Sequence, residues 1–150
     1  MAVDVATDII IDRPCAEVAA YAADPTNAPR WYANIESAAW RTPPHIAVGS
    51  QVDFVAHFLG RRLIYTYEIV ELAAGAKLVM RTAQGPFPME TTYTWTALDD
   101  THTRMTLRNR GEPAGFTKVA APLMTTAMRR ANQKDLAALK RILEDPPPVG

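Results

Sequence analysis

Hydrophobic and polar positions alternate over much of the segment between Ile35 and Arg110, most clearly in Met89–Ala97. In that stretch a methionine, a tyrosine and a tryptophan share one parity, while Glu90 and three threonines occupy the other. A two-residue period predicts a β-strand with one face covered and the other in water. Val52–Phe58 and Thr103–Leu107 repeat the pattern, so the sequence predicts a one-sided sheet that needs a cover.

The predicted elements begin with a mostly β-branched strand at Val3–Asp12. A short helix over Pro14–Ala23 follows, since Pro14 suits a first helical turn, and Asn27 is expected to cap a second short helix that runs to about Tyr32. Turn-forming residues then separate the remaining predicted strands. These are Ile35–Arg41, Gln51–Phe58, Arg62–Leu72, Lys77–Thr82, Met89–Leu98 and His102–Asn109.

The cover is predicted to be a long amphipathic helix over Glu112–Glu144, where apolar residues recur at steps of three and four. Pro122 cannot donate a helical hydrogen bond, so a kink or a second start is expected there. The prolines after Asp145 end the helix. We therefore expect one domain over residues 1–145 and a disordered tail over 146–150.

Composition narrows the function classes. The chain is 48% hydrophobic and 21% charged with zero formal net charge, which fits a globular protein and gives no general attraction to nucleic acid. Cys15 is the only cysteine, so no internal disulfide or thiolate cluster is possible. No secretory signal or run of about 18 apolar residues is present. We expect a cytoplasmic protein without an integral membrane segment.

Several short stretches carry a family resemblance. They are Ile9-Ile10-Ile11-Asp12-Arg13-Pro14 with Glu17-Val18, then Asp24-Pro25 and Trp31, Glu68-Ile69-Val70-Glu71-Leu72 before Lys77-Leu78-Val79, and the closing Asp135-Leu136 with Leu139-Lys140 and Leu143-Glu144. In this order they resemble the superfamily of START-related proteins, polyketide cyclases and birch-pollen allergens (SRPBCC). Within it the chain looks most like the bacterial polyketide cyclase/dehydratase-like branch.

The resemblance implies an α+β helix-grip fold, in which a seven-stranded curved antiparallel sheet wraps around a long C-terminal helix, with two short helices after the first strand. It also implies a cavity between the sheet and that helix. Similar proteins bind lipids, steroids or polyketides, and a minority catalyse cyclisation or dehydration. Membership alone does not choose among these activities.

The side chains expected to line the cavity are mostly aromatic residues and methionines on the apolar sheet face and the long helix. Methionine adapts to irregular apolar shapes, which suits a binding pocket, although such residues also commonly fill a core. Trp31 is added because the resemblance places its region near the cavity entrance, where it serves either packing or gating. The predicted ligand contacts are Trp31, Phe54, Phe58, Tyr65, Tyr67, Met80, Met89, Tyr93, Trp95, Met124 and Met128.

Residues with catalytic chemistry form no recognisable set. Tyr65 and Tyr67 share the face that carries Leu63 and Ile69, so their hydroxyls need interior partners, and acid catalysis by either requires a neighbour that lowers its pKa. The three histidines lack metal-ligand spacing, and no nucleophile motif or carboxylate pair occurs. We predict exposed positions for His57 and His102 and expect neither metal nor cofactor.

The leading hypothesis is therefore a binding protein for an apolar or aromatic small molecule that is lipid-, steroid- or polyketide-like. The alternative is a metal-free, lyase-like cyclase or dehydratase acting on an aromatic carbonyl compound. A third hypothesis, a partner-binding module, is disfavoured because threonines and charged residues dominate the outer sheet face. The sequence leaves monomer and homodimer open.

Overall fold

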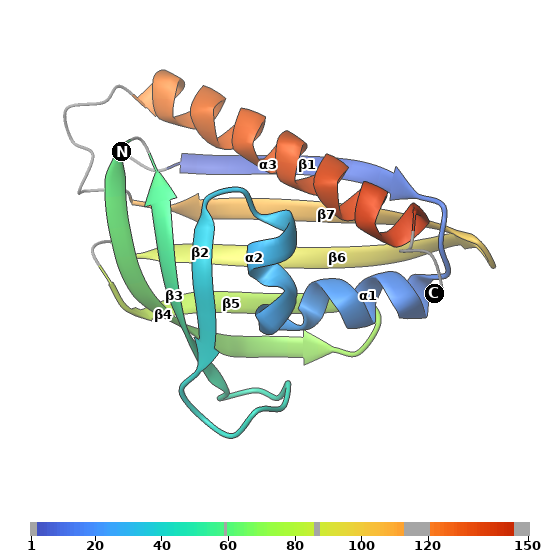
Figure 1. The fold of residues 1–150 in the computed structure, drawn as a ribbon, viewed down its shortest axis with the longest axis horizontal. Helices are drawn as coiled ribbons and strands as arrows, with labels where there is room; N and C mark the ends of the chain where they lie inside the picture. Colours follow the sequence, from blue (N-terminus) through green and yellow to red (C-terminus); the bar gives the residue numbers. More distant parts are fainter. Residues whose placement is uncertain (1–2, 59, 86–87, 113–120, 146–150) are drawn as a thin grey trace.

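The structure is a computed structural model that describes residues 3–58, 60–85, 88–112 and 121–145, except for the side chains of Phe58 and Ala121. Figure 1 shows the arrangement of its elements. In chain order these are β1 Val3–Ile11, α1 Cys15–Ala23, the 3-10 helix η1 Pro25–Asn27, α2 Ala28–Trp31, β2 Ile35–Trp40, β3 Gln51–Phe58, β4 Arg61–Ala73, β5 Lys77–Gln84, β6 Met89–Asp99, β7 His102–Gly111 and α3 Ala121–Glu144.

The strands form one antiparallel sheet in the order β1-β7-β6-β5-β4-β3-β2. The predicted seven-stranded helix-grip architecture is therefore confirmed. Opposite residues bring the large side chains together, since Tyr93 faces Leu107 and Trp95 faces Met105 across β6 and β7. All four of these side chains are buried. The two-residue alternation thus identified the covered face correctly.

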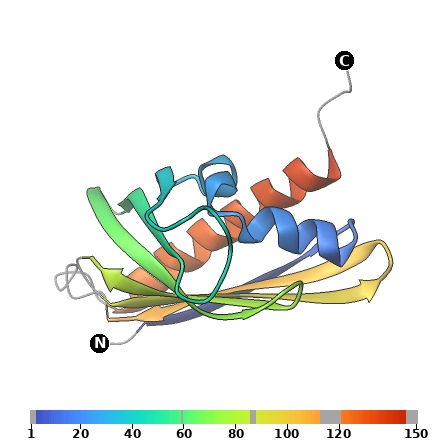
Figure 2. The same ribbon diagram turned by 90° about the horizontal axis from the view of Figure 1, so that it is seen from below.

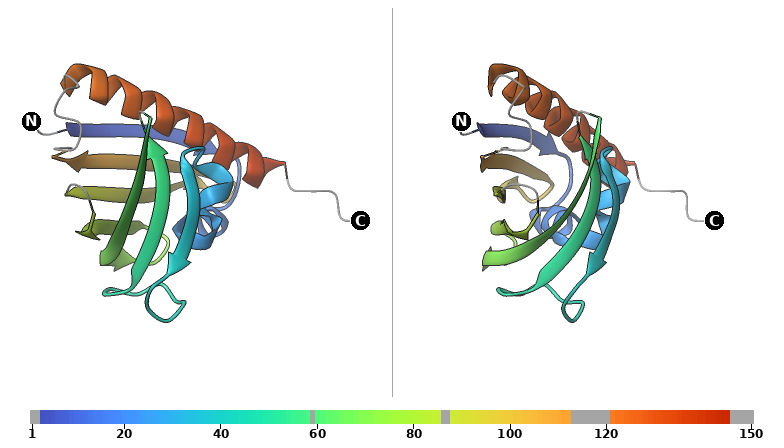
Figure 3. Two further views of the ribbon diagram at one scale, coloured as in Figure 1. Left: turned by 60° about the vertical axis from the view of Figure 1, so that its left-hand side comes forward. Right: turned by 90° about the vertical axis from the view of Figure 1, so that its left-hand side faces the viewer.

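The sheet curves most strongly along β4. Its pairing with β5 shifts register between Thr66 and Tyr67 and again between Ile69 and Glu71. Register irregularities of this kind bend a strand and increase its twist. As a result, β2, β3 and the first half of β4 cross over the end of the other strands and form a second wall, as Figures 1 and 3 show.

Helix α3 lies across the concave side of this sheet, and α1 and α2 cover the remaining part of that side (Figure 2). Leu136 and Leu139, in the C-terminal half of α3, are fully buried in a cluster with Ile11, Val18 and Trp31. Met124 and Met128, in the N-terminal half, belong to a smaller cluster. The two halves of α3 therefore meet different surroundings.

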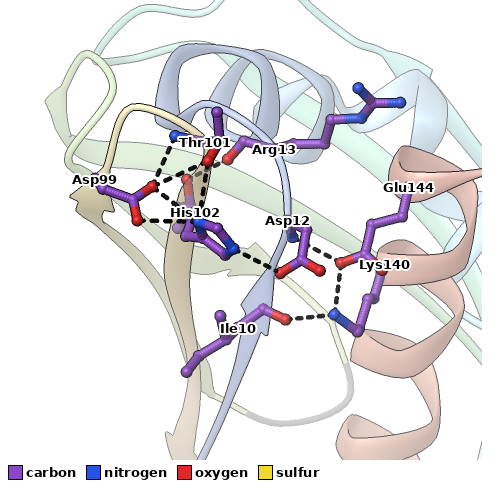
Figure 4. Close-up of polar contacts among 9 residues, drawn as sticks. Ile10, Asp12, Arg13, Asp99, Thr101, His102, Lys140 and Glu144 are labelled. Carbon is purple, nitrogen blue, oxygen red and sulfur yellow. Dashed lines mark hydrogen bonds and ion pairs between the residues drawn. The ribbon is translucent and has the colours of Figure 1, made fainter.

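The C-terminal end of α3 is tied to the end of β1 and to the chain that follows it (Figure 4). The Lys140 ammonium donates to the Ile10 carbonyl at 2.8 Å, and the Arg13 guanidinium donates to the Leu143 carbonyl at 2.7 Å. The Glu144 carboxylate accepts from the Asp12 backbone N–H at 2.6 Å. These contacts satisfy groups at a helix terminus and fix its position over the sheet.

His102 is the first residue of β7 after the neighbouring β6–β7 turn and is half-buried, with 43% of its side chain accessible, so it is less exposed than predicted. Its imidazole lies 2.8 Å from Asp99 Oδ1 and 3.5 Å from Asp12 Oδ1. The Asp99 hydrogen bond is the main reason that the pKa of His102 is raised, with Asp12 and Glu144 adding to it. These exposed contacts organise the turn and do not approach the interior (Figure 4).

Two predicted helix boundaries differ from the structure. Asn27 does not cap α2 with its side chain, because its amide donates to the Tyr21 carbonyl instead. The preceding turn is closed by Asp24, whose carboxylate accepts from the Thr26 N–H. Glu112 is not helical, because it follows the last ladder of β7. Residues 113–120 of the predicted helix, and the predicted tail at 146–150, lie outside the described residues.

Candidate functional site

A cavity of about 160 Å³ lies between the concave sheet face and the N-terminal half of α3. The structure places most of the predicted ligand contacts around it. These are Phe54, Tyr65, Tyr67, Met80, Met89, Tyr93, Met124 and Met128. The aromatic rings of β3 and β4 form one wall, where Phe54 and Tyr65 stack with centroids 5.5 Å apart and Tyr67 meets both edge-on.

The backbone at Gly85, beside this wall, has no room for a side chain. Gly85 has a φ of +158°, and a β carbon there would lie 2.8 Å from the Tyr65 β carbon. Such a contact is too close without a shift of the neighbouring strand. Glycine at this position therefore allows the chain just after β5 to pass close to Tyr65.

Trp31 and Trp95 are buried but do not line the cavity. They pack behind it, with Trp31 4.1 Å from the Tyr32 ring and Trp95 6.0 Å from the Tyr93 ring, centroid to centroid. Their role is to support the tyrosines that do reach the cavity. Phe58 lies in β3, but its side chain is outside the described part of the structure.

Two of these tyrosines share a hydrogen bond. The hydroxyls of Tyr32 and Tyr93 are 2.6 Å apart. Burial is the main cause that raises the pKa of both, and it also raises the pKa of Tyr65 and Tyr67. Each phenol is therefore a weaker acid than free tyrosine, which is the opposite of what acid catalysis by Tyr65 or Tyr67 requires.

Apart from the Tyr32–Tyr93 pair, four polar side chains form a row of hydrogen bonds along the cavity wall. The Tyr67 hydroxyl lies 3.0 Å from Thr91 Oγ1, which donates to Asn109 Oδ1 at 3.0 Å. Asn109 Nδ2 in turn donates to Asn132 Oδ1 at 3.4 Å. The row crosses from β4 through β6 and β7 to α3. Sequence reasoning missed Asn109 and Asn132, although the two-residue period puts Asn109 on the face of Met105 and Leu107.

Asp135 is the one carboxyl group among the described residues of the cavity wall. It is only 2% exposed, and its Oδ1 accepts from the Ala33 N–H at 3.0 Å. Burial raises its pKa to about 6, against the opposing effects of the Ala33 hydrogen bond and Lys134. The sequence carried a usable signal, because Asp135 falls on the helical face shared by Asn132 and Leu139.

The cavity reaches the surface beside β2 and β3. His57 lines it and is exposed, as predicted, with its Nε2 3.0 Å from Glu36 Oε2. Asn34 and Ile35 lie at the same end and are half-buried. His45, in the loop before β3, is exposed and does not line the cavity. His57 is the one exposed residue among the described lining residues, so the cavity lining comes nearest to solvent here.

The outer face of the sheet is different in character. Glu90 accepts hydrogen bonds from both Arg81 and Arg110, which lower its pKa, and Arg108 pairs with Asp4 at 2.6 Å. Paired charges of this kind leave little apolar surface for docking. Across the described residues no set of three metal-binding side chains comes together, and no helix is long and apolar enough to cross a membrane.

Comparison with known proteins places this geometry in context. A family model described as polyketide cyclase / dehydrase and lipid transport matches residues 2–144. None of the curated proteins matches the sequence.

Solved structures give the same answer for the fold. The Zhui aromatase/cyclase from a Streptomyces species is 16% identical, with a TM-score of 0.77 over 99% of this chain and 100% of that chain. A START superfamily protein from Mycobacterium smegmatis is 14% identical, with a TM-score of 0.77 over 94% and 97%. The di-domain ARO/CYC BexL is 19% identical, with a TM-score of 0.72 over 94% of this chain and 46% of that chain. At these identities the likeness concerns the fold.

Proposed function

Because the chain belongs to the polyketide cyclase / dehydrase and lipid transport family, we propose that its cavity binds an apolar, aromatic small molecule about one ring across. The observation that carries this proposal is the cavity itself, with about 160 Å³ of space behind aromatic and methionine side chains. A dry protein cavity of roughly 150 Å³ is enough to hold benzene. A lipid or steroid needs more room, which the flexible methionines Met80, Met89, Met124 and Met128 can supply by changing rotamer.

The expected affinity follows from the buried area. An aromatic ring with a short substituent buries roughly 150–250 Å², which corresponds to about 4–6 kcal/mol at ~25 cal/mol per Å². Part of this is offset by lost motion of the ligand. Without that offset the free energy would correspond to Kd values of about 0.05–1 mM, so single-ring ligands are expected to bind at the weak end of this range or in the low millimolar range, which NMR titration measures well.

Filling the cavity is expected to abolish this binding. Ala131 lines the cavity from α3, so Ala131→Phe puts a ring into the space that the ligand needs. We expect the Kd for isopropylbenzene, from a titration of ¹⁵N-labelled protein, to rise at least about tenfold, because the filled volume removes most of the apolar contact.

The matched control is Ala137→Phe, since Ala137 is half-buried on the same helix and does not line the cavity. This variant is expected to bind isopropylbenzene like the wild type. Unchanged binding in Ala131→Phe, with ligand-induced shifts at residues away from α3, would place the ligand elsewhere and reject the cavity as the site.

A second candidate function is a dehydratase- or cyclase-type enzyme, and Asp135 is the observation that favours it. A buried carboxyl with a pKa near 6 exchanges protons readily at neutral pH, whereas the cavity tyrosines do not. In a dehydration, the Asp135 carboxylate takes the proton α to the ligand carbonyl. The protonated Asp135 then gives this proton to the β-hydroxyl, which leaves as water as the Cβ–O bond breaks, and a conjugated double bond remains.

The test is turnover of a single-ring aromatic β-hydroxyketone, followed by the ultraviolet absorbance of the conjugated enone. If the chain is an enzyme of this type, Asp135→Asn is expected to lower kcat by roughly 10²–10⁴-fold, the usual contribution of a general base, while binding persists. Turnover that survives in Asp135→Asn contradicts this role. Binding without any turnover by the wild type leaves the ligand-binding function alone.

A further inference from the structure

The row of hydrogen bonds along the cavity wall has a direction. Thr91 donates its hydroxyl proton to Asn109 Oδ1, so the Tyr67 hydroxyl must donate to Thr91. Asn109 then donates its amide to Asn132 Oδ1. Each member accepts from the one before it and donates to the next. Asn132 uses its Oδ1 as the acceptor, so the row ends at its Nδ2 amide group, whose protons are free to donate.

Those protons have no acceptor. Asn132 is 4% exposed, and its Nδ2 is buried without a hydrogen-bond partner in the described part of the chain. A buried amide donor left unpaired is unfavourable and unusual in a folded protein. Tyr21, Trp31 and Trp95 also have unpaired buried donors, but Asn132 is the member of this group that lines the cavity.

The charged residues around the cavity limit which kind of acceptor a ligand can bring to Asn132. No lysine or arginine occurs among the described lining residues, and Asp135 lies one helical turn from Asn132 on the same face of α3. An anionic ligand would therefore be buried without a positive partner and next to a carboxyl group, which is strongly unfavourable. A neutral acceptor oxygen meets neither penalty.

We propose that Asn132 Nδ2 donates a hydrogen bond to the carbonyl oxygen of the bound molecule, which makes the preferred ligand a neutral aromatic ketone or aldehyde. This inference rests on the proposed binding function and adds the chemical class of the ligand. The ring occupies the space between Phe54, Tyr65 and the methionines. The carbonyl points to α3 and completes the row that starts at Tyr67.

Two ligands of equal size test the inference. Acetophenone and isopropylbenzene have the same number of non-hydrogen atoms and a similar size, but only acetophenone carries an acceptor oxygen. We expect acetophenone to shift the side-chain amide resonance of Asn132 in ¹⁵N spectra and isopropylbenzene to leave it near its free position. In Asn132→Leu, the ratio of the isopropylbenzene Kd to the acetophenone Kd is expected to fall about five- to tenfold, which is the typical strength of one hydrogen bond. Hydration differences between the ligands cancel in this comparison.

The matched control is Gln133→Leu, because Gln133 is exposed on the same helix and does not line the cavity. This variant is expected to keep the wild-type ratio. If both ligands bind and neither the ratio nor the Asn132 resonance responds, the inference is wrong while the binding function stands. If phenol binds well and acetophenone does not, the row runs in the opposite direction and the donor assignment fails. If none of the three binds the wild type, the proposed function fails as well.

Discussion

Asp135→Asn is expected to raise the free energy of unfolding by up to about 3 kcal/mol at pH 7–8 and by almost nothing below pH 4. The asparagine has the same shape and keeps an oxygen for the Ala33 N–H, but it carries no charge. At neutral pH the wild type must hold a carboxylate at a site that is 2% exposed. Removing that charge removes the desolvation penalty.

The sign follows from the pKa shift. Burial raises the pKa of Asp135 from 3.8 to about 6, so the folded protein binds this proton more tightly than the unfolded chain. The stabilisation from the protonated form is complete below pH 3.8 and is lost as the pH rises to about 6. A shift of about 2 pKa units corresponds to about 3 kcal/mol.

Urea unfolding of both proteins at several pH values measures this effect. The quantity of interest is the difference between the two free energies, since Asp4, Glu90 and Asp99, whose pKa values are lowered, titrate in both proteins and cancel. The difference should grow between pH 4 and 6 and then stay constant. A difference that does not depend on pH would mean that the Asp135 carboxyl is hydrated in the folded protein.

This prediction also bears on function. A carboxyl group whose charge lowers stability at neutral pH is the kind of group that persists at functional sites rather than in cores. The cavity tyrosines are poor proton donors because burial raises their pKa values. In the proposed enzyme, proton transfer to or from a ligand would therefore depend on Asp135.

The fold was predictable from the sequence because its signals are local and periodic. Alternation over Met89–Ala97 identified Tyr93 and Trp95 as interior residues, and turn formers separated the strands. Helix boundaries were less predictable. Asn27 is a good capping residue, yet its amide binds the Tyr21 carbonyl, a contact that depends on how α1 and η1 pack.

The apolar wall was predictable for the same reason, but its polar groups were not. Asn109 is a polar residue near the end of a strand, and Asn132 and Asp135 lie among charged residues such as Lys134. Their chemistry arises only when the curved sheet brings β7 and the middle of α3 to the same cavity. Trp31 shows the opposite case, since a large aromatic side chain in the right region packs behind the wall rather than in it.

The two halves of α3 are expected to differ sharply in what a truncated side chain costs. Leu139 is fully buried in the main core, so Leu139→Ala should lower the free energy of unfolding by about 2–5 kcal/mol through lost contacts and a new void. Met128 is 9% exposed and already borders the cavity. It has fewer partner atoms to lose, so Met128→Ala should cost about 1–2 kcal/mol.

Urea unfolding at neutral pH measures both free-energy changes. Leu123→Ala is the matched control, because Leu123 lies on the same helix and is 66% exposed. This variant should change the free energy of unfolding by less than about 0.5 kcal/mol. Met128→Ala should also enlarge the cavity and admit a two-ring ligand such as naphthalene more readily than the wild type does. A larger loss for Met128→Ala than for Leu139→Ala would show that the N-terminal half of α3 is packed as core. The cavity would then be too well filled to serve as a binding site. The C-terminal half of α3 is anchored in the core at Leu139, so space for a ligand can come only from loose packing around its N-terminal half.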